Sequence, residues 1–533
     1  MSIIPETTDN LVNRYNELKS ARSNFENLWQ EVVKFICPDR ADFTLKRTAG
    51  APRYNKLLNS VGVESALFLA ASLNGMMTDP SAKWFLLRFA GGQNAGGAWD
   101  RWLSECNEIF WYELYSPGAN FGAALNETYN DDASINTSLL FTSWNDQRNG
   151  LLFQSRTVAE CVIDEDASGN VNRLFRRFSF SAPQLVEAFK DFKFDQKILD
   201  EAKNGKSVRN YDILHCVMPN DDPKIPREFK GVYVLIRERK ILKTEFYHEF
   251  PFAVTRWGKL SGEIYGRGPG IASLSELRML QDVMVSYIIA AQKAADPPVL
   301  VQSDETFLPG ATRPSGVIRY EAVEPKAFEN GSNFQVSEHI IERSENKVRK
   351  MFLNDRLADV LGDRATATEV IQIVRENARV LGPIYWRQVN EKLNPCLRRA
   401  FNLCLRHGKF PQMPGDPEGI GIDIEYVSPM AQAFKYEKAD RINQAFVAST
   451  PFLQIDPQSS ALFDAQRAIR TLHDIYGVND VLRSEKDVED ILNRQAQEQE
   501  KMQSVSDAAQ ALELENMQNS VIAQERENND RTS

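Results

Sequence analysis

The chain has 533 residues, with 63 Lys and Arg against 73 Asp and Glu, which gives a formal net charge of −10. At roughly 100–200 residues per domain, this length suggests three or four packed units rather than one core. The negative balance excludes a protein whose whole surface binds nucleic acid nonspecifically, so any contact with DNA must be local.

Cysteine and histidine content narrows the possibilities further. The six cysteines show neither disulfide-framework nor zinc-site spacing, which favours reduced, cytoplasmic thiols. The five histidines include no H-x-x-x-H pair, so the sequence offers few candidate residues for a metal centre or a histidine-based triad. The N-terminus lacks the pattern of a secretory signal, and no uncharged run reaches membrane-spanning length. We therefore expect no cofactor, no metal and no membrane contact.

The first third of the chain is predicted to be mostly helical. Apolar residues from Leu11 to Ile36 recur every three or four positions, which indicates one long helix ended by Pro38, with Arg22 marking a boundary in the stripe. Helical patterns also cover Lys56 to Met77, Ala98 to Tyr115 and Phe121 to Asn136.

From Leu151 onward the pattern becomes that of strands. Two β-branched and aromatic runs, Leu151 to Ile163 and Val171 to Phe180, flank the turn-forming segment DEDASGN and predict a hairpin. The runs YDILHCVMP, GVYVLIRERKILKTEFYHEF and PFAVTRW predict further strands up to about Leu260. The fold class is therefore α+β, mainly α.

Two short motifs imitate phosphate-binding loops. Gly266, Gly268 and Gly270 are spaced G-x-G-x-G rather than G-x-G-x-x-G, and Pro269 removes one amide donor. Gly205-Lys206-Ser207 resembles the end of a Walker loop, but the required glycine five residues earlier is Asp200. Neither motif predicts a nucleotide site.

Acidic clusters also offer no catalytic arrangement. Asp131-Asp132 and Asp164-Glu165-Asp166 are placed in turn-like contexts, where carboxylates usually cap or hydrate the backbone. We therefore expect a protein that is not an enzyme.

The centre of the chain predicts two long helices that bracket a strand-rich segment. Helical spacing runs from Leu274 to Ala291 and stops at Asp296-Pro297-Pro298, and a second helix runs from about Asn333 to Asn354. One face of the second helix is charged, opposite an apolar face; the charged residues are Glu338, Glu342, Glu345, Arg349 and Arg356. Such a face is often only solvated, but an isolated helix pair cannot bury its own sides and should pack against copies of itself.

A polar loop follows the second helix. Thr366 and Glu369 form a capping box that starts a third helix, and Gly382-Pro383 and Pro395 predict that this helix is kinked. After a Pro- and Gly-rich connector with one strand, the chain is predicted to be helical to an acidic end.

Several of these segments resemble the head-to-tail connector, or portal, proteins of short-tailed bacteriophages (podovirus type). The resemblance lies in YGRGPG before the first central helix, DPP after it, and TATEV with RENARVLGPIYWRQVNEKLNPCLRRAF beyond the polar loop. The N-terminal RSNFENLWQEVVKFICPDRADF agrees, so the resemblance covers nearly the whole chain in order.

The resemblance implies the portal fold and its regions. These are a wing (1–265), stem helix 1 (266–296), a β-rich clip (297–332), stem helix 2 (333–354), a tunnel loop (355–366), a kinked wing helix (367–410) and a C-terminal region with a helical crown (411–533). Gly266, Gly268, Pro269 and Gly270 would form the wing-stem hinge, with the glycines supplying backbone freedom and Pro269 fixing the first helical turn.

The resemblance also implies a function. About twelve identical chains would form a ring at one capsid vertex, through which double-stranded DNA is packaged and ejected. Partners would be the terminase packaging motor, a tail adaptor, and the major capsid and scaffolding proteins, in a virion assembled in the host cytoplasm. The charged face of stem helix 2 would line the channel. By position and polarity, the tunnel-loop residues would be Asp355, Asp359, Asp363 and Arg364, with a disordered linker as the alternative interpretation of this segment. The clip residues expected to make contacts are Phe307, Arg313 and Arg319.

Two other classes of protein stay open on the sequence. A capsid or scaffold protein would form shells or filaments instead of a ring with a hole. A nucleotide-binding enzyme is the less favoured alternative, because the phosphate-loop motifs are incomplete.

Overall fold

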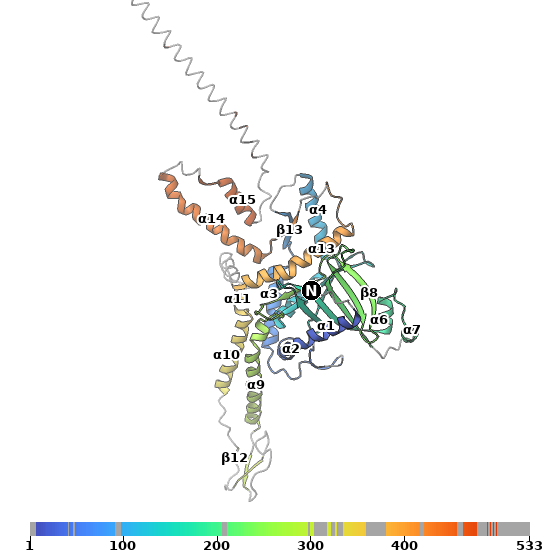
Figure 1. Ribbon diagram of the computed structural model, residues 1–533. Helices are drawn as coiled ribbons and strands as arrows, with labels where there is room; N and C mark the ends of the chain where they lie inside the picture. Colours follow the sequence, from blue (N-terminus) through green and yellow to red (C-terminus); the bar gives the residue numbers. More distant parts are fainter. Residues whose placement is uncertain are drawn as a thin grey trace, which may run out of the picture. The chain divides into compact units, whose positions relative to one another are not determined.

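The computed structural model describes most of the chain and divides it into two compact units, Met1–Phe434 and Lys435–Ser533 (Figure 1). The described residues are 7–40, 42–45, 48, 50–90, 97–204, 210–296, 299–302, 317–320, 326–327, 334–358, 380–415, 421–455 and 462–476, with single helical positions at 488, 491, 494, 497 and 517. The first unit combines helices with β-sheets, as the α+β expectation requires.

The N-terminal segment forms two helices, so the expectation of one long helix is wrong. α1 (Thr8–Ala21) and α2 (Ser23–Phe35) are separated at Arg22, whose side chain is buried. The Arg22 guanidinium donates to the backbone carbonyls of Val158 and Cys161, at 3.0 and 2.5 Å. A buried cation needs such partners, and the chain bends where it obtains them.

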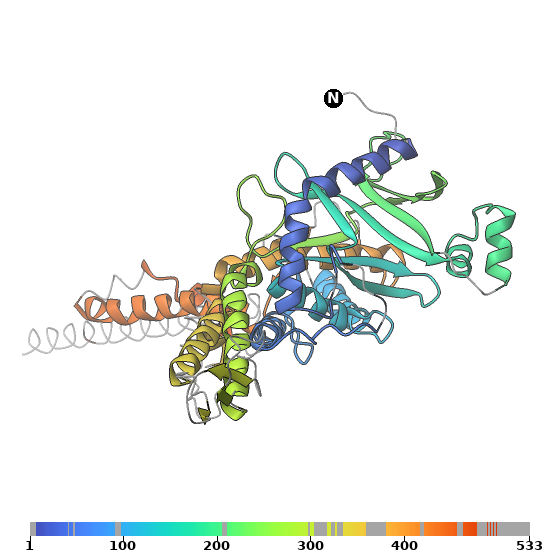
Figure 2. The same ribbon diagram turned by 90° about the horizontal axis from the view of Figure 1, so that it is seen from below.

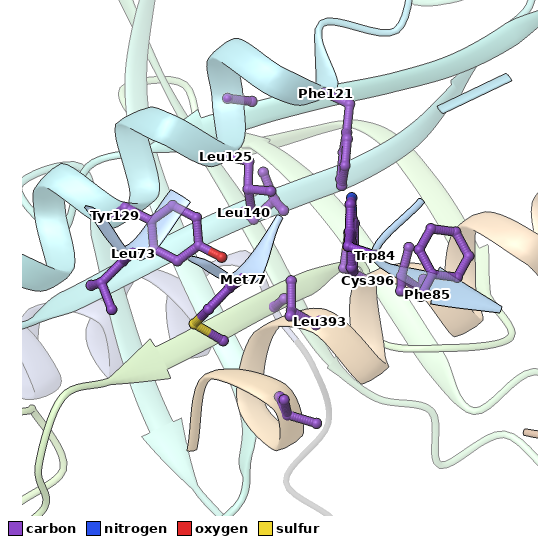
Figure 3. Packing of buried hydrophobic residues seen from close by; sticks show 14 of the residues in the cluster. Leu73, Met77, Trp84, Phe85, Phe121, Leu125, Tyr129, Leu140, Leu393 and Cys396 are labelled. Atoms are coloured by element: carbon purple, nitrogen blue, oxygen red, sulfur yellow. The ribbon is translucent and has the colours of Figure 1, made fainter. Parts of the chain in front are cut away.

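Three helices build the main hydrophobic core beside a short sheet. α3 (Val61–Met77), α4 (Gly97–Leu114) and α5 (Phe121–Ser134) confirm the helical periodicity of this region. The short sheet pairs β1 (Phe85–Phe89) with β13 (Ile422–Tyr426) in antiparallel register. Figure 3 shows side chains of this core, including Trp84, Phe121 and Tyr129, packed with Leu393 and Cys396 from the other half of the unit.

Two antiparallel sheets form the remainder of this α+β region. The three-stranded sheet has the order β3-β2-β9, with β2 (Thr137–Asn145), β3 (Gly150–Arg156) and β9 (Phe252–Arg256). The five-stranded sheet runs in sequence order, with β4 (Cys161–Glu165), β5 (Val171–Ser181), β6 (Asn210–Pro219), β7 (Phe229–Leu235) and β8 (Lys240–Tyr247). α6 (Ala182–Ala188) and α7 (Gln196–Lys203) connect β5 to β6.

The predicted hairpin is confirmed as β4 and β5, but its first run divides. Residues Gly150–Arg156 pair with β2, and Cys161–Glu165 pair with β5 in the other sheet. Asp166 in the turn accepts backbone N–H groups from Ser168 and Asn170, which is the capping role expected for this cluster. Local periodicity identified the strands but not the sheet to which each belongs.

The expected hinge glycines lie at a close approach of two backbones. They lead through α8 (Pro269–Ala272) into α9 (Leu274–Ala295). A Cβ atom on Gly266 would lie 2.1 Å from the Asn136 carbonyl oxygen, and one on Gly270 would lie 1.8 Å from that of Ser134. Neither glycine has a positive φ. The glycines are therefore required by space rather than by backbone freedom, while the hinge itself stays a prediction.

The two long central helices are confirmed. α9 and α10 (Phe334–Met351) lie side by side in both ribbon views (Figures 1 and 2). Between them in sequence, β10 (Val299–Gln302), β11 (Val317–Tyr320) and β12 (Lys326–Ala327) form a three-stranded sheet in which β10 is central. A short helix, α11 (Asn354–Ala358), follows α10.

The third helix is segmented near Pro395 as predicted, by a specific device. Helical residues 380–388 continue into a π-helical turn, η3 (Val389–Leu393), and then into α13 (Asn394–Arg406). The Asn394 N–H bonds to the Val389 carbonyl five residues back. This wider turn precedes Pro395, which has no N–H to offer. The capping box at Thr366 lies outside the described residues.

The second unit is helical where it is described. α14 (Pro429–Ile455) begins in the first unit, and α15 (Ala465–Tyr476) belongs to the second. The Phe446 and Phe463 rings pack within the second unit, with centroids 5.3 Å apart. Among the residues described, no helix is both long and apolar enough to cross a bilayer.

Candidate assembly and channel surface

Burial along the α9/α10 pair changes halfway along each helix. On α9 the buried residues are Leu274, Glu276, Leu277 and Leu280, and none of the later described positions is buried. On α10 the buried residues are Ser344 and Val348. Each helix is thus anchored at one end, while the other ends (281–296 and 335–343) contain no buried residue among those described.

An apolar groove runs between these outer halves. It has a volume of about 700 Å³, and its lining residues are Met279, Asp282, Val283, Ser286, Tyr287, Ala290, Ser337 and Ile340. Other apolar side chains of the same helix segments are also exposed: Val285 is 41% exposed, Ile289 44% and Val336 53%. Clustered apolar side chains on one surface are typical of a site that another surface covers.

The predicted channel-lining residues do not share one environment. Glu345 accepts a hydrogen bond from Asn59 Nδ2 at 2.7 Å, and its carboxylate lies 3.4 Å from Arg349. Glu338 is exposed and accepts from the Tyr287 hydroxyl at 3.0 Å. Glu342 is exposed and makes no hydrogen bond or ion pair within the described part of the chain. Of the acidic three, Glu342 is thus the most available to a ligand in solvent.

The exposed side of α10 extends beyond the residues chosen from the sequence. His339, Arg343, Asn346 and Lys350 are exposed, and helical spacing places them on the side next to Glu342. The exposed side therefore carries charges of both signs. Lys347 is also exposed, and it pairs with Glu276 of α9. The helical period could have found the first four residues, but not the partner of Lys347.

The tunnel-loop and clip residues are only partly placed. Asp355 and Arg356 are exposed residues of α11, so the loop begins with a helical turn. Arg319 belongs to β11. Asp359, Asp363 and Arg364 of the loop, and Phe307 and Arg313 of the clip, lie outside the described residues.

A buried charge network holds the helix that follows the loop. Lys392 of η3 pairs with Asp132 of α5, and both side chains are fully buried. Gln388 donates to Asp132 Oδ2 at 2.9 Å, and the Lys392 ammonium lies 4.2 Å from the Tyr129 ring centroid. Burial raises the pKa of Asp132 and lowers that of Lys392, against the attraction between them.

The neighbouring carboxylate, Asp131, is also buried. It accepts two hydrogen bonds from Arg40, at 2.7 and 2.8 Å. Burial raises its pKa to about 6, although Arg40 opposes the rise. The expectation that Asp131 and Asp132 are hydrated turn residues is therefore wrong, because each has a cation from a distant part of the sequence. In the described residues, no cluster of three potential metal ligands occurs.

A family comparison identifies the kind of protein to which this surface belongs. The family described as "Bacteriophage head to tail connecting protein" matches residues 8–482. The chain belongs to this family. It is therefore a phage head-tail connector, a structural protein rather than an enzyme, as the sequence resemblance implied.

Individual relatives agree over the same length. The chain is 24% identical over 490 residues to a "Probable portal protein" of Bordetella phage BPP-1, covering 88% of this chain and 87% of the relative. It is 23% identical over 535 residues to the "Portal protein" of Salmonella phage epsilon15, covering 93% of both chains. A solved structure described as "Neck of empty GTA particle computed with C6 symmetry" matches 78% of this chain and 94% of its own, at 10% identity and a TM-score of 0.35.

Proposed function

We propose that copies of this connector close into a ring of about twelve subunits at one capsid vertex, around a channel for double-stranded DNA. The observation that carries the proposal is the apolar groove on the outer halves of α9 and α10, which nothing in the described part of the chain covers. A different face of the helix pair of a neighbouring copy is the occupant, because a head-to-tail contact that repeats with a closing rotation produces a ring.

The physical gain comes from removing apolar surface from water. Burying such surface contributes about 25 cal/mol per Å². Met279, Val285 and Ile289 would supply it from one helix, and Val336 and Ile340 from the other. The anchored halves of both helices, held at Leu280 and Val348, would keep this surface in a fixed orientation.

The regions of the chain take the roles expected from the resemblance. Residues 1–265 form the wing, α9 and α10 the stem, 297–332 the clip, 355–366 the tunnel loop, 367–410 the wing helix and 411–533 the C-terminal region with its crown. The clip would contact first the packaging motor and later the tail adaptor. ATP hydrolysis would belong to the motor.

The charges on α10 would let DNA slide. Repeated by ring symmetry, Glu338 and Glu342 become rings of carboxylates that repel phosphate. Arg349 and Arg356 would attract phosphate only briefly. A channel lined mainly by cations would release counterions at every position and hold the duplex in place.

Assembly is tested on the purified full-length chain by native mass spectrometry and negative-stain imaging. We expect closed rings with a central hole for the wild type and dispersed chains for Ile289→Glu, because a carboxylate would have to be buried in the proposed contact between subunits. Ile289→Leu, which keeps apolar area, is the matched control and should form rings. Shells or filaments from the wild type would instead favour a coat or scaffold protein, and a stable monomer would contradict the proposal.

The channel role is tested separately with Glu342→Lys in assembled particles. Reversing this charge should slow DNA ejection, measured as DNA released over time. Normal ring formation with unchanged packaging and ejection rates would remove Glu342 from the channel wall while leaving the ring intact.

A further inference from the structure

A pocket lies between the two larger sheets, away from α9 and α10. Its volume is about 470 Å³, within the range typical of small-molecule sites. Six aromatic side chains line it: Phe141, Phe178, Phe180, Phe189, Tyr233 and Phe252. The charged groups in the lining are three cations, Arg156, Arg176 and Lys243, against the single carboxylate of Glu245.

The strand registers explain why these side chains meet. In the five-stranded sheet, Arg176, His215, Tyr233 and Lys243 lie directly opposite one another on β5, β6, β7 and β8. In the three-stranded sheet, Gln154, Phe141 and Phe252 form the corresponding row across β3, β2 and β9. The pocket lies between these two rows, since ring contacts join His215 to Phe141 and Phe252 across the gap.

Arg156 is the one cation of the lining that has no carboxylate partner in the described residues. Arg176 pairs with Glu160 at 3.0 Å, and Lys243 pairs with Glu245 at 2.6 Å. Arg156 makes one hydrogen bond, to the amide oxygen of Gln154, and its Nε is buried without a partner. Burial, with Arg176 nearby, lowers the pKa of Arg156. The residue is half-buried, and a guanidinium whose Nε is buried in this state is costly unless an anion accompanies it.

His215 presents a second unsatisfied group at the same place. The residue is 2% exposed, and its Nε2 has no hydrogen-bond partner. Its ring is stacked on Tyr233, with centroids 4.1 Å apart and planes within 2°. Burial, Arg176 and Arg156 lower the pKa of His215 to about 3, so the imidazole is neutral at pH 7. A neutral imidazole can still offer one N–H to an acceptor.

We propose that this pocket binds a small organic anion that has a flat apolar body. The negative group would take the unused donors of Arg156 and His215, and the flat body would lie among the aromatic side chains. Either a nucleoside monophosphate or an aromatic carboxylate has this chemistry. The pocket is lined by other elements than α9 and α10, which form the proposed contact between subunits. The binding proposal therefore does not depend on the assembly proposal.

The proposal makes a specific statement about stability without ligand. If Arg156 served only to support the fold, its removal should destabilise the protein. The removal of an unpaired buried cation kept for a ligand should not, because it relieves a desolvation cost. Arg156→Gln should therefore have a melting temperature equal to or above that of the wild type when no anion is added.

The binding test uses the full-length protein at constant pH and ionic strength. The probes are dAMP, benzoate and inorganic phosphate. Their binding is measured by the shift in melting temperature and by calorimetric titration. We expect one organic anion to raise the melting temperature in a saturable way and more than inorganic phosphate does. A stronger effect of dAMP identifies a nucleotide site, and a stronger effect of benzoate identifies a carboxylate site. Arg156→Gln should weaken that binding at least tenfold.

Two further variants keep the test decisive. His215→Phe preserves the stacked ring but removes Nε2, and it should also weaken binding. Arg148→Gln removes an exposed arginine from the turn between β2 and β3, the strand that carries Arg156, and should bind like the wild type. The proposal is overturned if no organic anion exceeds phosphate, if Arg156→Gln and His215→Phe bind as the wild type does, or if Arg156→Gln alone lowers the melting temperature strongly.

Discussion

The folded body of the first unit and the outer halves of α9 and α10 differ in which side chains are buried. In the body, buried carboxylates pair with cations of the same chain, as in Asp132 with Lys392 and Asp131 with Arg40. In the outer helix halves, no described residue is buried, although Val285 and Ile289 are apolar. The body makes these pairs within one chain, whereas we propose that the outer helix halves make their contacts with another copy.

The largest loss of stability is expected when a buried ion pair of the body is broken. Lys392→Met leaves Asp132 buried without its cation, and such losses cost about 3–5 kcal/mol. The measurement is chemical unfolding of the dissociated chain. The double variant Asp132→Leu with Lys392→Met removes both charges and should recover most of the loss. If the single variant is as stable as the wild type, the pair does not hold η3 to α5.

Gly270 tests the joint between the body and α9. Gly270→Ala would place a Cβ 1.8 Å from the Ser134 carbonyl oxygen, so the backbones must separate. Overpacking typically costs about 1–3 kcal/mol, and a backbone clash belongs at the upper end. Gly75→Ala in α3 is the control, because its Cβ would meet nothing within 4 Å. That change should stabilise the helix by about 0.5–1 kcal/mol. Equal effects of the two substitutions would contradict the close approach.

Buried His215 predicts a dependence of stability on pH. Its folded pKa of about 3 lies below the ordinary value of about 6.5, so the unfolded chain binds more protons between these values. Stability from this group is complete above about pH 6.5 and falls as the pH is lowered. By pH 5 the loss should be about 2 kcal/mol, at 1.36 kcal/mol per unit. Because Asp131, with its raised pKa, has the opposite sign, the comparison must be with His215→Phe, which should lose this part of the slope. Parallel pH profiles for the two proteins would show that His215 is not buried in its neutral form.

The two regions also differ in how far the sequence predicts them. Helical periodicity located α9 and α10 to within a few residues, since an apolar stripe is a local property. The break at Arg22 was not predicted as a helix end, because its acceptors lie at Val158 and Cys161, more than 130 positions away. For the same reason the burial of Asp132 depends on Lys392, 260 positions later. Pairings of this kind are invisible to a local pattern.

The candidate sites were also predicted only where the signal is local in the sequence. The charged stripe of α10 was visible in the sequence, but the contact of Glu345 with Asn59 was not. The pocket around Arg156 had no sequence signal, because its lining comes from seven strands and α6 whose alignment depends on sheet register.

The smallest expected effect distinguishes two glutamates of one helix face. Glu345→Gln keeps an oxygen that can accept the hydrogen bond from Asn59, but it loses the negative charge next to Arg349. Because helical i,i+4 ion pairs contribute about 0.3–0.5 kcal/mol, the variant should be less stable by about that amount. Glu342→Gln should leave stability unchanged, because the side chain is exposed and unbonded among the described residues. For DNA transit the order should reverse, with Glu342→Gln changing ejection kinetics more, since an unpaired exposed carboxylate acts on a passing phosphate without a competing cation. Equal kinetic effects would mean that the contact with Asn59 does not remove Glu345 from the channel wall.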